Sequence, residues 1–175
     1  MAIDMQPMLS GEVSRIGLDY TFSLTDGEYP FDIGVDGVVF SKPVQVTGEI
    51  VNMAGYIRLT AQAEVEYDTE CARCLEPLHS TFSVELERTV VNEGELCNTP
   101  EEEADDYIEI VGTKLDLDPV IAEELMMSFP TKELCKEDCK GLCPKCGKNL
   151  NEGECGCVKK EIDPRLAILQ KLLEK

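Results

Sequence analysis

The chain has 175 residues, of which 43% are hydrophobic, and its formal net charge is −19. This length allows one main hydrophobic core with a small appended module, and no apolar stretch approaches the roughly 20 residues that a membrane-spanning helix needs. The N-terminus also lacks the basic segment and apolar run of a secretory signal, so we expect a soluble, cytoplasmic protein with no membrane partner.

Residues 13–91 show a hydrophobic period of two, which predicts β-strands that each bury one face. Residues 1–12 are expected to be loosely held. Several strands joined by turns rich in Gly, Asn and Asp predict a strongly curved antiparallel sheet or a small barrel. The strands are expected over residues 16–24, 38–51, 56–67 and 81–91.

Residues 93–106 contain seven acidic side chains and no basic ones, which predicts a mobile loop. One more strand is expected at 107–112. A helix packed on the sheet is predicted over 117–129, with Asp118 as its N-cap. After a cysteine-rich stretch, leucines at helical spacing predict a terminal helix over 163–175. These elements together predict an α+β fold.

The chain divides into a strand-rich acidic body, residues 1–131, and a cysteine-rich module with the terminal helix, residues 132–175. The module holds ten Lys and Arg against eight Asp and Glu, so the body carries a formal charge of −21. Such a body repels phosphate backbones, and any RNA contact is expected to use the module, although its basic residues could equally be solvated surface charges. The candidate contacts are Lys136, Lys140, Lys145, Lys148, Lys159, Lys160 and Arg165.

Six of the nine cysteines lie between residues 135 and 157. The run Cys143-Pro-Lys-Cys146-Gly has the spacing of a zinc knuckle, in which two thiolates hold one ion and a small residue lets the chain turn back. In a reducing cytoplasm, closely spaced pairs of this kind favour zinc over disulfides. The module is therefore predicted to bind zinc.

A further pair, Cys71 and Cys74, lies at a corner between two predicted strands, so eight thiols form two sets of four. Cys135 and Cys139 are spaced to share one face of a helical turn and could meet the corner pair. This would give two structural zinc ions, and at least one is expected. The corner pair could instead only pack, or act as a redox dithiol. The remaining set is Cys143, Cys146, Cys155 and Cys157, and Cys97 is left as an exposed thiol.

Catalysis is not expected. The single histidine, His79, follows the corner and is predicted to have a surface or structural role. The chain has no nucleophile elbow, no Walker-type glycine loop and no dinucleotide fingerprint, and so no small-molecule substrate is expected. The carboxylates of residues 101–106 lie in the predicted loop, where they are expected to be hydrated.

Two motifs resemble those of a known bacterial family. The run Cys71-ARCLE-Pro77 after alternating strands looks like the signature of the YceD family, and the tail, Cys139-KGLCPKCGKNLNEGECG-Cys157 before Asp163-PRLAILQKL-Leu173, is similar to its long form. The resemblance implies a non-enzymatic factor in 23S rRNA synthesis, processing or stability, in large-subunit ribosome biogenesis.

The partners expected from this resemblance and from the acidic body are ribosomal RNA, a basic large-subunit ribosomal protein, or both, and no DNA. Two alternatives remain at this point. The chain could be an acidic chaperone for a basic ribosomal protein, or a redox switch in which oxidation of the thiolates releases zinc.

Overall fold

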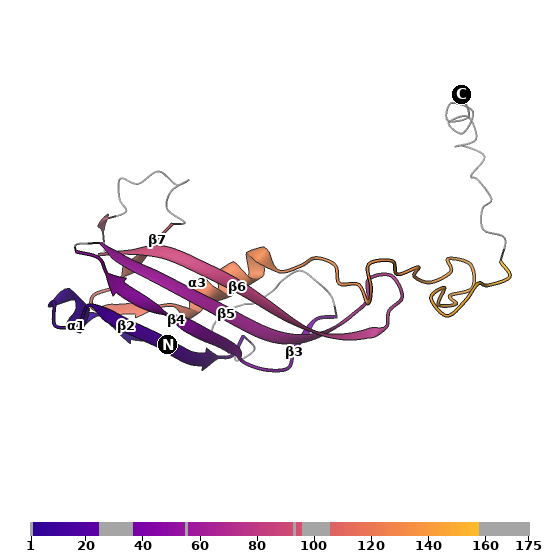
Figure 1. The fold of residues 1–175 in the computed structure, drawn as a ribbon, viewed down its shortest axis with the longest axis horizontal. Coiled ribbons are helices and arrows are strands. Elements are labelled where there is room, and N and C mark those ends of the chain that lie inside the picture. Colours follow the sequence, from indigo (N-terminus) through magenta and orange to yellow (C-terminus); the bar gives the residue numbers. More distant parts are fainter. Residues whose placement is uncertain (1, 25–36, 55, 93, 96–105, 158–175) are drawn as a thin grey trace, which may run out of the picture.

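The computed structural model describes residues 2–24, 37–54, 56–92, 94–95 and 106–157. This part of the chain is mostly sheet with few helices. The molecule is elongated: the sheet and helix α3 (Asp118–Ser128) lie toward one end, and the cysteine-rich module lies at the other (Figure 1). None of the described helices is long and apolar enough to cross a membrane.

The main sheet is open in the order β2-β4-β5-β6-β7, with the short β3 beside β5. No pairing joins the edge strands β2 and β7 in the described chain, so a closed barrel does not form. The pairing is antiparallel except between β6 and β7, which run parallel. The strands are β2 (Arg15–Phe22), β3 (Val39–Phe40), β4 (Val44–Asn52), β5 (Ile57–Glu70), β6 (Pro77–Asn92) and β7 (Tyr107–Ile110).

The predicted alternation along the strands is confirmed most clearly in β5. Leu59, Ala61 and Ala63 are buried, and the residues between them are exposed. The buried face packs against α3, which contributes Ile121 and Leu125 at 1% and 0% exposure. One face of the sheet therefore carries the core, as is common for antiparallel sheets.

The N-terminal residues are ordered, and the expectation of a loose start is wrong. Strand β1 (Ala2–Asp4) pairs with β8 (Lys114–Asp116), and the short helix α1 (Gln6–Leu9) follows it. Met5 and Met8 are 0% and 1% exposed. Their burial depends on residues more than a hundred positions away, which a local hydrophobic pattern cannot reveal.

Helix α3 is present where it was predicted, but Asp118 is not its N-cap. Leu117 takes the N-cap position without a side-chain hydrogen bond, and Asp118 is the first helical residue, 7% exposed. Burial, followed by the nearby Asp118 carboxylate, raises the pKa of Tyr20 in β2. Asp118 therefore faces the sheet instead of capping the helix.

An aromatic cluster packs the residue that follows α3 against strands β5 and β6, where the chain continues to the module. The Phe129 ring lies 4.9 Å from that of Tyr67 and 5.3 Å from that of Phe82, measured between centroids and with edge-to-face geometry. Beyond this cluster the Tyr67 hydroxyl donates a hydrogen bond of 2.7 Å to Glu133 Oε1. These contacts hold residues 130–134 along the end of β5.

Strands β5 and β6 continue together beyond β4, and only the two-residue β3 pairs with β5 there, at Tyr67 and Asp68. They pair from Ile57↔Val90 to Glu70↔Pro77, whereas β4 accompanies β5 only as far as Glu64. We call residues 65–82 the ribbon. Its connecting turn, residues 71–76, carries the first cysteine pair to the module (Figure 1).

Candidate metal centres

The turn at the end of the ribbon is a knuckle closed by two backbone hydrogen bonds. The Leu75 amide donates to the Cys71 carbonyl at 2.9 Å, and the Cys71 amide donates to the Glu76 carbonyl at 2.8 Å. Leu75 has φ +60°, in the left-handed region that usually favours glycine. Leu75 is 57% exposed, so packing of its side chain does not explain this conformation.

The pair in the module forms the same turn. The Gly147 amide donates to the Cys143 carbonyl at 2.8 Å, and the Cys143 amide donates to the Lys148 carbonyl at 2.9 Å. Gly147 has φ +73°. The two cysteine pairs therefore share one backbone geometry. Sequence reasoning identified it only for the second pair, because in the first pair leucine stands in the position of the glycine.

The corner pair meets the first two cysteines of the module. The Sγ atoms of Cys71 and Cys139 are 3.7 Å apart, and those of Cys74 and Cys135 are 3.6 Å apart. Zinc–sulfur bonds of about 2.3 Å in a tetrahedron place sulfurs about 3.8 Å apart, whereas a disulfide needs about 2.05 Å. We call this set the proximal centre: Cys71, Cys74, Cys135 and Cys139, with all four sulfurs within 4.8 Å of one another.

The other four cysteines of the module also converge, and their sulfurs lie within 4.8 Å of one another. We call Cys143, Cys146, Cys155 and Cys157 the distal centre. Cys143 is buried at 6% exposure, whereas Cys146 is exposed. The proximal centre is more enclosed, because three of its four cysteines are 5% exposed or less. All eight cysteines of the two centres are free thiols.

The turn at residues 143–148, which we call the distal knuckle, has backbone amides that favour the ionised form of the Cys143 thiol. Hydrogen bonds from the amides of Cys146 and Lys145 lower the pKa of Cys143 to about 6. In contrast, a hydrogen bond with Cys146 and then burial raise the pKa of Cys157 to about 12. A divalent cation would allow all four thiols to ionise, because it offsets the repulsion among their charges.

The proximal centre has the same character. Burial opposes ionisation of Cys71, but backbone amides, led by that of Cys135, outweigh it and lower the pKa of Cys71 to about 6. A hydrogen bond from the Asn151 side chain is the main cause that lowers the pKa of Cys139. Four thiols with amides directed at their sulfurs form a donor set that fits zinc.

Hydrogen bonds also join the module to the knuckle on the ribbon. The Ala72 amide donates to the Glu133 carbonyl at 2.8 Å, and the Leu142 amide donates to the Arg73 carbonyl at 3.0 Å. Arg73 Nη1 donates to the Cys139 carbonyl at 2.8 Å. Residues 135–139 form a turn and not the helical turn that their spacing suggested, since the hydrogen bond runs from the Cys139 amide to the Lys136 carbonyl at 3.1 Å.

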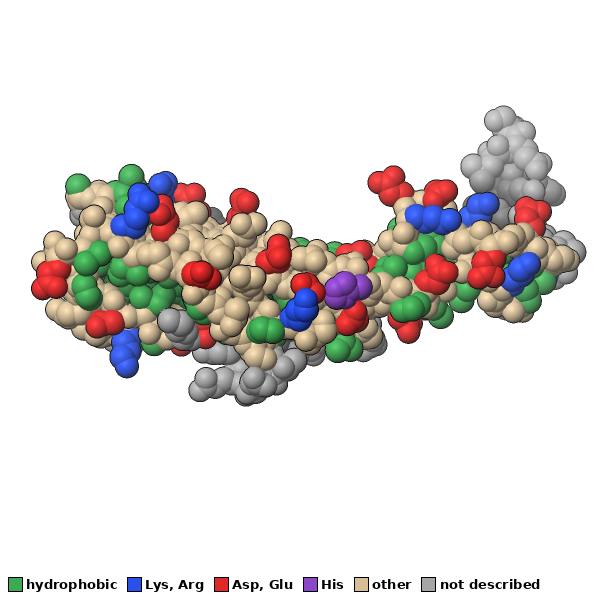
Figure 2. Space-filling model, turned by 60° about the horizontal axis from the view of Figure 1, so that its bottom comes forward, with side chains coloured by type: hydrophobic (Ala, Val, Ile, Leu, Met, Phe, Trp, Pro, Cys, Tyr) green, Lys and Arg blue, Asp and Glu red, His purple; other side chains and the backbone are tan. Residues whose placement is uncertain are grey.

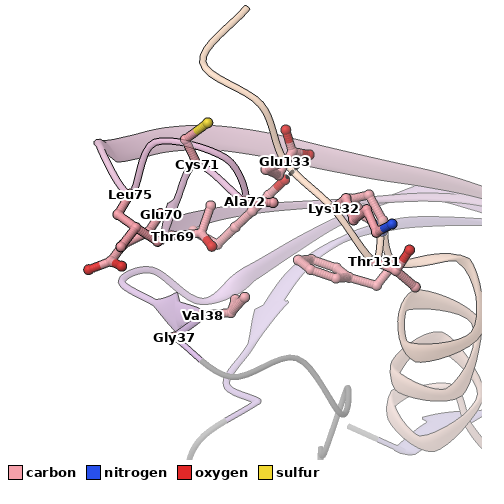
Figure 3. Close-up of a pocket in the computed structure, with 13 residues that line it drawn as sticks. Gly37, Val38, Thr69, Glu70, Cys71, Ala72, Leu75, Thr131, Lys132 and Glu133 are labelled. Atoms are coloured by element: carbon pink, nitrogen blue, oxygen red, sulfur yellow. Dashed lines mark hydrogen bonds between the residues drawn. The ribbon is translucent and has the colours of Figure 1, made fainter. Parts of the chain in front are cut away.

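A pocket of about 190 Å³ lies beside this junction (Figure 3). It is bounded by Gly37 and Val38, the end of β5, the knuckle and residues 129–133. Among its lining residues, the Tyr67 hydroxyl already donates a hydrogen bond to Glu133. Cys71 of the proximal centre is one of the residues that line it.

Four of the predicted basic contacts lie on the module surface. Lys136, Lys140, Lys145 and Lys148 are all exposed, and Figure 2 shows Lys and Arg side chains among acidic ones over this end of the molecule. Residues 132–157 hold five lysines and five acidic residues, so this part of the module is neutral while the body is strongly acidic. Lys159, Lys160, Arg165, Cys97 and the predicted terminal helix lie outside the described residues.

His79 lies on the exposed face of the ribbon between two carboxylates. Its Nδ1 is 2.8 Å from Asp68 Oδ1, and its Nε2 is 3.3 Å from Glu66 Oε2. These contacts across the β5–β6 pair agree with the predicted surface role.

We expect the pKa of His79 to lie above 6.5, mainly because of its hydrogen bond to Asp68. The stabilisation from these contacts is complete below the unfolded pKa and is lost as the pH rises through the higher folded pKa. NMR titration of this single imidazole checks the prediction. Asp68→Asn should lower the pKa, whereas Glu85→Gln, elsewhere on the sheet, should not. An equal pKa in all three proteins would contradict this account.

The sequence model of one family, described as large ribosomal RNA subunit accumulation protein YceD, matches residues 59–173. The chain belongs to the YceD family. The match includes the ribbon, its knuckle and all eight cysteines of the two centres, so both centres lie inside the region that the family shares.

Several curated proteins are similar to this YceD-family chain. An uncharacterised Mycobacterium tuberculosis protein is 35% identical over 59% of this chain and 49% of its own length. Bacillus subtilis YlbN, also uncharacterised, is 26% identical over 77% of this chain and 76% of its own. The Arabidopsis thaliana protein named large ribosomal RNA subunit accumulation protein YCED homolog 1, chloroplastic, is 28% identical over 93% of this chain and 55% of its own.

The chain thus spans about half the length of the first of these relatives. No solved structure matches it.

Proposed function

We propose that this chain is a non-enzymatic factor in large ribosomal subunit biogenesis that supports the synthesis, processing or stability of 23S rRNA. The observation that carries the proposal is the family match over residues 59–173, together with the names of the plant relatives. The structure supports a binding role in that process. It contains two sets of four converging thiols, and sites of this kind stabilise a fold without leaving an open position for catalysis.

In this proposal each four-thiol set holds one structural zinc ion in the cytoplasm. Four sulfur ligands leave no open coordination position, which is typical of structural and not catalytic zinc. The proximal centre then clamps the module, residues 132–175, to the body, residues 1–131. The clamp presents the module as a rigid surface at the end of the ribbon.

The module is the proposed contact with RNA. The described part of the module lies at the opposite end of the molecule from most of the sheet (Figure 1), and its lysines are exposed, so the repulsion between the body and phosphates is weakest there. Lys145 is the best single probe: it lies inside the distal knuckle and is exposed. Lys148 is a less suitable probe, because its Nζ donates a hydrogen bond of 3.3 Å to the Glu154 carbonyl and replacing it would also remove a contact within the module.

Binding of the purified protein to 23S rRNA fragments tests this proposal. We expect the affinity for RNA to fall steeply with salt concentration. Lys145→Glu should weaken binding and make the negative slope of log affinity against log salt concentration shallower by about 1. Lys114→Glu makes the same charge change on the body and should have little effect. Equal binding by both variants would contradict the module as the RNA contact.

A second candidate function is supported by the charge of −21 on residues 1–131. Such a body could bind a basic large-subunit ribosomal protein and shield it from non-specific contact with RNA. In that case the chain would bind the ribosomal protein tightly, and Lys145→Glu would leave that affinity unchanged. Crosslinking in growing cells, followed by identification of the RNA and protein recovered, separates the two candidates.

A further inference from the structure

We propose that Asn151 is a positioning residue for the proximal centre and that, through it, the distal centre controls how firmly the proximal centre holds its metal. The inference rests on the proposed metal centres. It concerns a side chain that belongs to neither cysteine set but contacts one of them.

The Asn151 carboxamide is held at both ends. Its Oδ1 accepts a hydrogen bond of 2.9 Å from the Lys140 amide, which can only donate. The opposite end of the carboxamide, Nδ2, therefore faces Cys139 and donates to its Sγ at 3.3 Å. The reverse orientation would place an oxygen against the sulfur and an NH₂ group against an N–H donor. The contacts thus permit one orientation, with a donor directed at a proximal thiolate.

Asn151 reaches this position because it follows the distal knuckle. We call residues 147–151 the strap. The strap begins at the knuckle hydrogen bond from the Cys143 amide to the Lys148 carbonyl, and the Leu150 amide then donates to the Gly141 carbonyl at 2.8 Å. The next distal ligand is Cys155, four residues beyond the strap. The distal thiols therefore flank the strap on both sides.

Hydrogen bonds to a ligand atom orient that ligand and spread its charge, so losing one weakens metal binding by about 10- to 100-fold. A metal in the distal centre holds the strap, and the strap holds the donor on Cys139. Removing the distal metal frees the strap, so the hydrogen bond from Asn151 to Cys139 is lost and the proximal centre binds its metal more weakly. Because coupling between binding sites is reciprocal, an occupied proximal centre also favours metal in the distal one.

The decisive variant is Asn151→Asp in the full chain. Aspartate keeps an oxygen for the Lys140 amide but replaces the donor on Cys139 with a negatively charged oxygen. Asn149→Asp is the matched control, because it makes the same change on the same strap and keeps the oxygen that accepts the Asn151 amide at 3.0 Å. Any effect of added charge alone is therefore common to both variants.

The probe is cadmium-113, which replaces zinc and gives one NMR resonance for each centre, assigned through the Cβ protons of its cysteines. We expect Asn151→Asp to shift the proximal resonance and to speed loss of that metal to a competing chelator about tenfold or more. Asn149→Asp should leave both properties as in the wild type. Two bound ions with an unchanged release rate in Asn151→Asp would overturn this inference alone. A wild-type chain that binds no metal would overturn the proposed centres as well.

A double-mutant cycle tests the direction of control. Replacing Cys155 and Cys157 with serine empties the distal centre and should speed release from the proximal centre. In the Asn151→Asp background the same replacement should speed release from the proximal centre little further, because the hydrogen bond from residue 151 to Cys139 is already absent. Additive effects would show that the distal centre acts by another route, and they would overturn the control through Asn151.

Discussion

Replacing Cys74 with serine is expected to lower the bound zinc from about two ions per chain to about one and to free the module from the ribbon. Cys74 is 5% exposed, and its sulfur lies 3.6 Å from that of Cys135, on the opposite side of the junction. A structural zinc contributes roughly 10 to 16 kcal/mol of binding free energy in small zinc domains, so an incomplete ligand set costs much of the clamp.

Elemental analysis measures the zinc, and hydrogen exchange measures the clamp. The Ala72 and Leu142 amides, which bond across the junction, should lose protection in Cys74→Ser. The sheet amides should keep theirs. Cys97→Ser is the control, because each centre already has four other cysteines, and this variant should keep about two zinc ions. If Cys74→Ser kept both the metal and the protected amides, the corner pair would be a packing feature and not a ligand pair.

The division of the cysteines could be predicted from the sequence, because the constraint is local. One to three residues between the cysteines of each pair bring both sulfurs to one side of a turn, and eight paired thiols suggest two sets of four. The geometry at Leu75 could not be predicted, because its left-handed φ of +60° occurs without a glycine to indicate it. The bond from Asn151 to Cys139 was missed for a different reason, since no spacing rule links an asparagine to a cysteine twelve residues earlier.

The strands were predicted well where one face is buried and the other is wet, as in β5. The edges of the sheet were predicted less well. The parallel pairing of β7 with β6 depends on the path of the intervening chain, and a short alternating segment such as Tyr107–Ile110 does not indicate in which direction it will pair. Burial of Met5 likewise depends on a backbone bond to Thr113, 2.8 Å long, which is invisible in a local window.

Gly48→Ala is expected to destabilise the body strongly while leaving the metal centres intact. Gly48 lies in β4 opposite Ala61 of β5. A Cβ at this position would lie 2.2 Å from the Thr60 carbonyl oxygen and 2.7 Å from the Ala61 Cα, so the two strands would have to move apart. Overpacking typically costs about 1–3 kcal/mol, and because this clash is with backbone atoms we expect a loss at the upper end of that range, a large part of the stability of an ordinary domain.

Gly17→Ala is the matched control, because Gly17 lies in the neighbouring strand β2 and its added Cβ would meet nothing within 4 Å. Loss of glycine flexibility should make that variant equal to the wild type or slightly more stable. Urea unfolding of the sheet, followed by circular dichroism, measures the difference, and the zinc content should stay at about two ions per chain in both variants. Equal midpoints would mean that β4 and β5 can separate at little cost. A loss of both zinc ions in Gly48→Ala would mean that the distal centre also depends on the folded body, and the division at residues 131 and 132 would then be wrong.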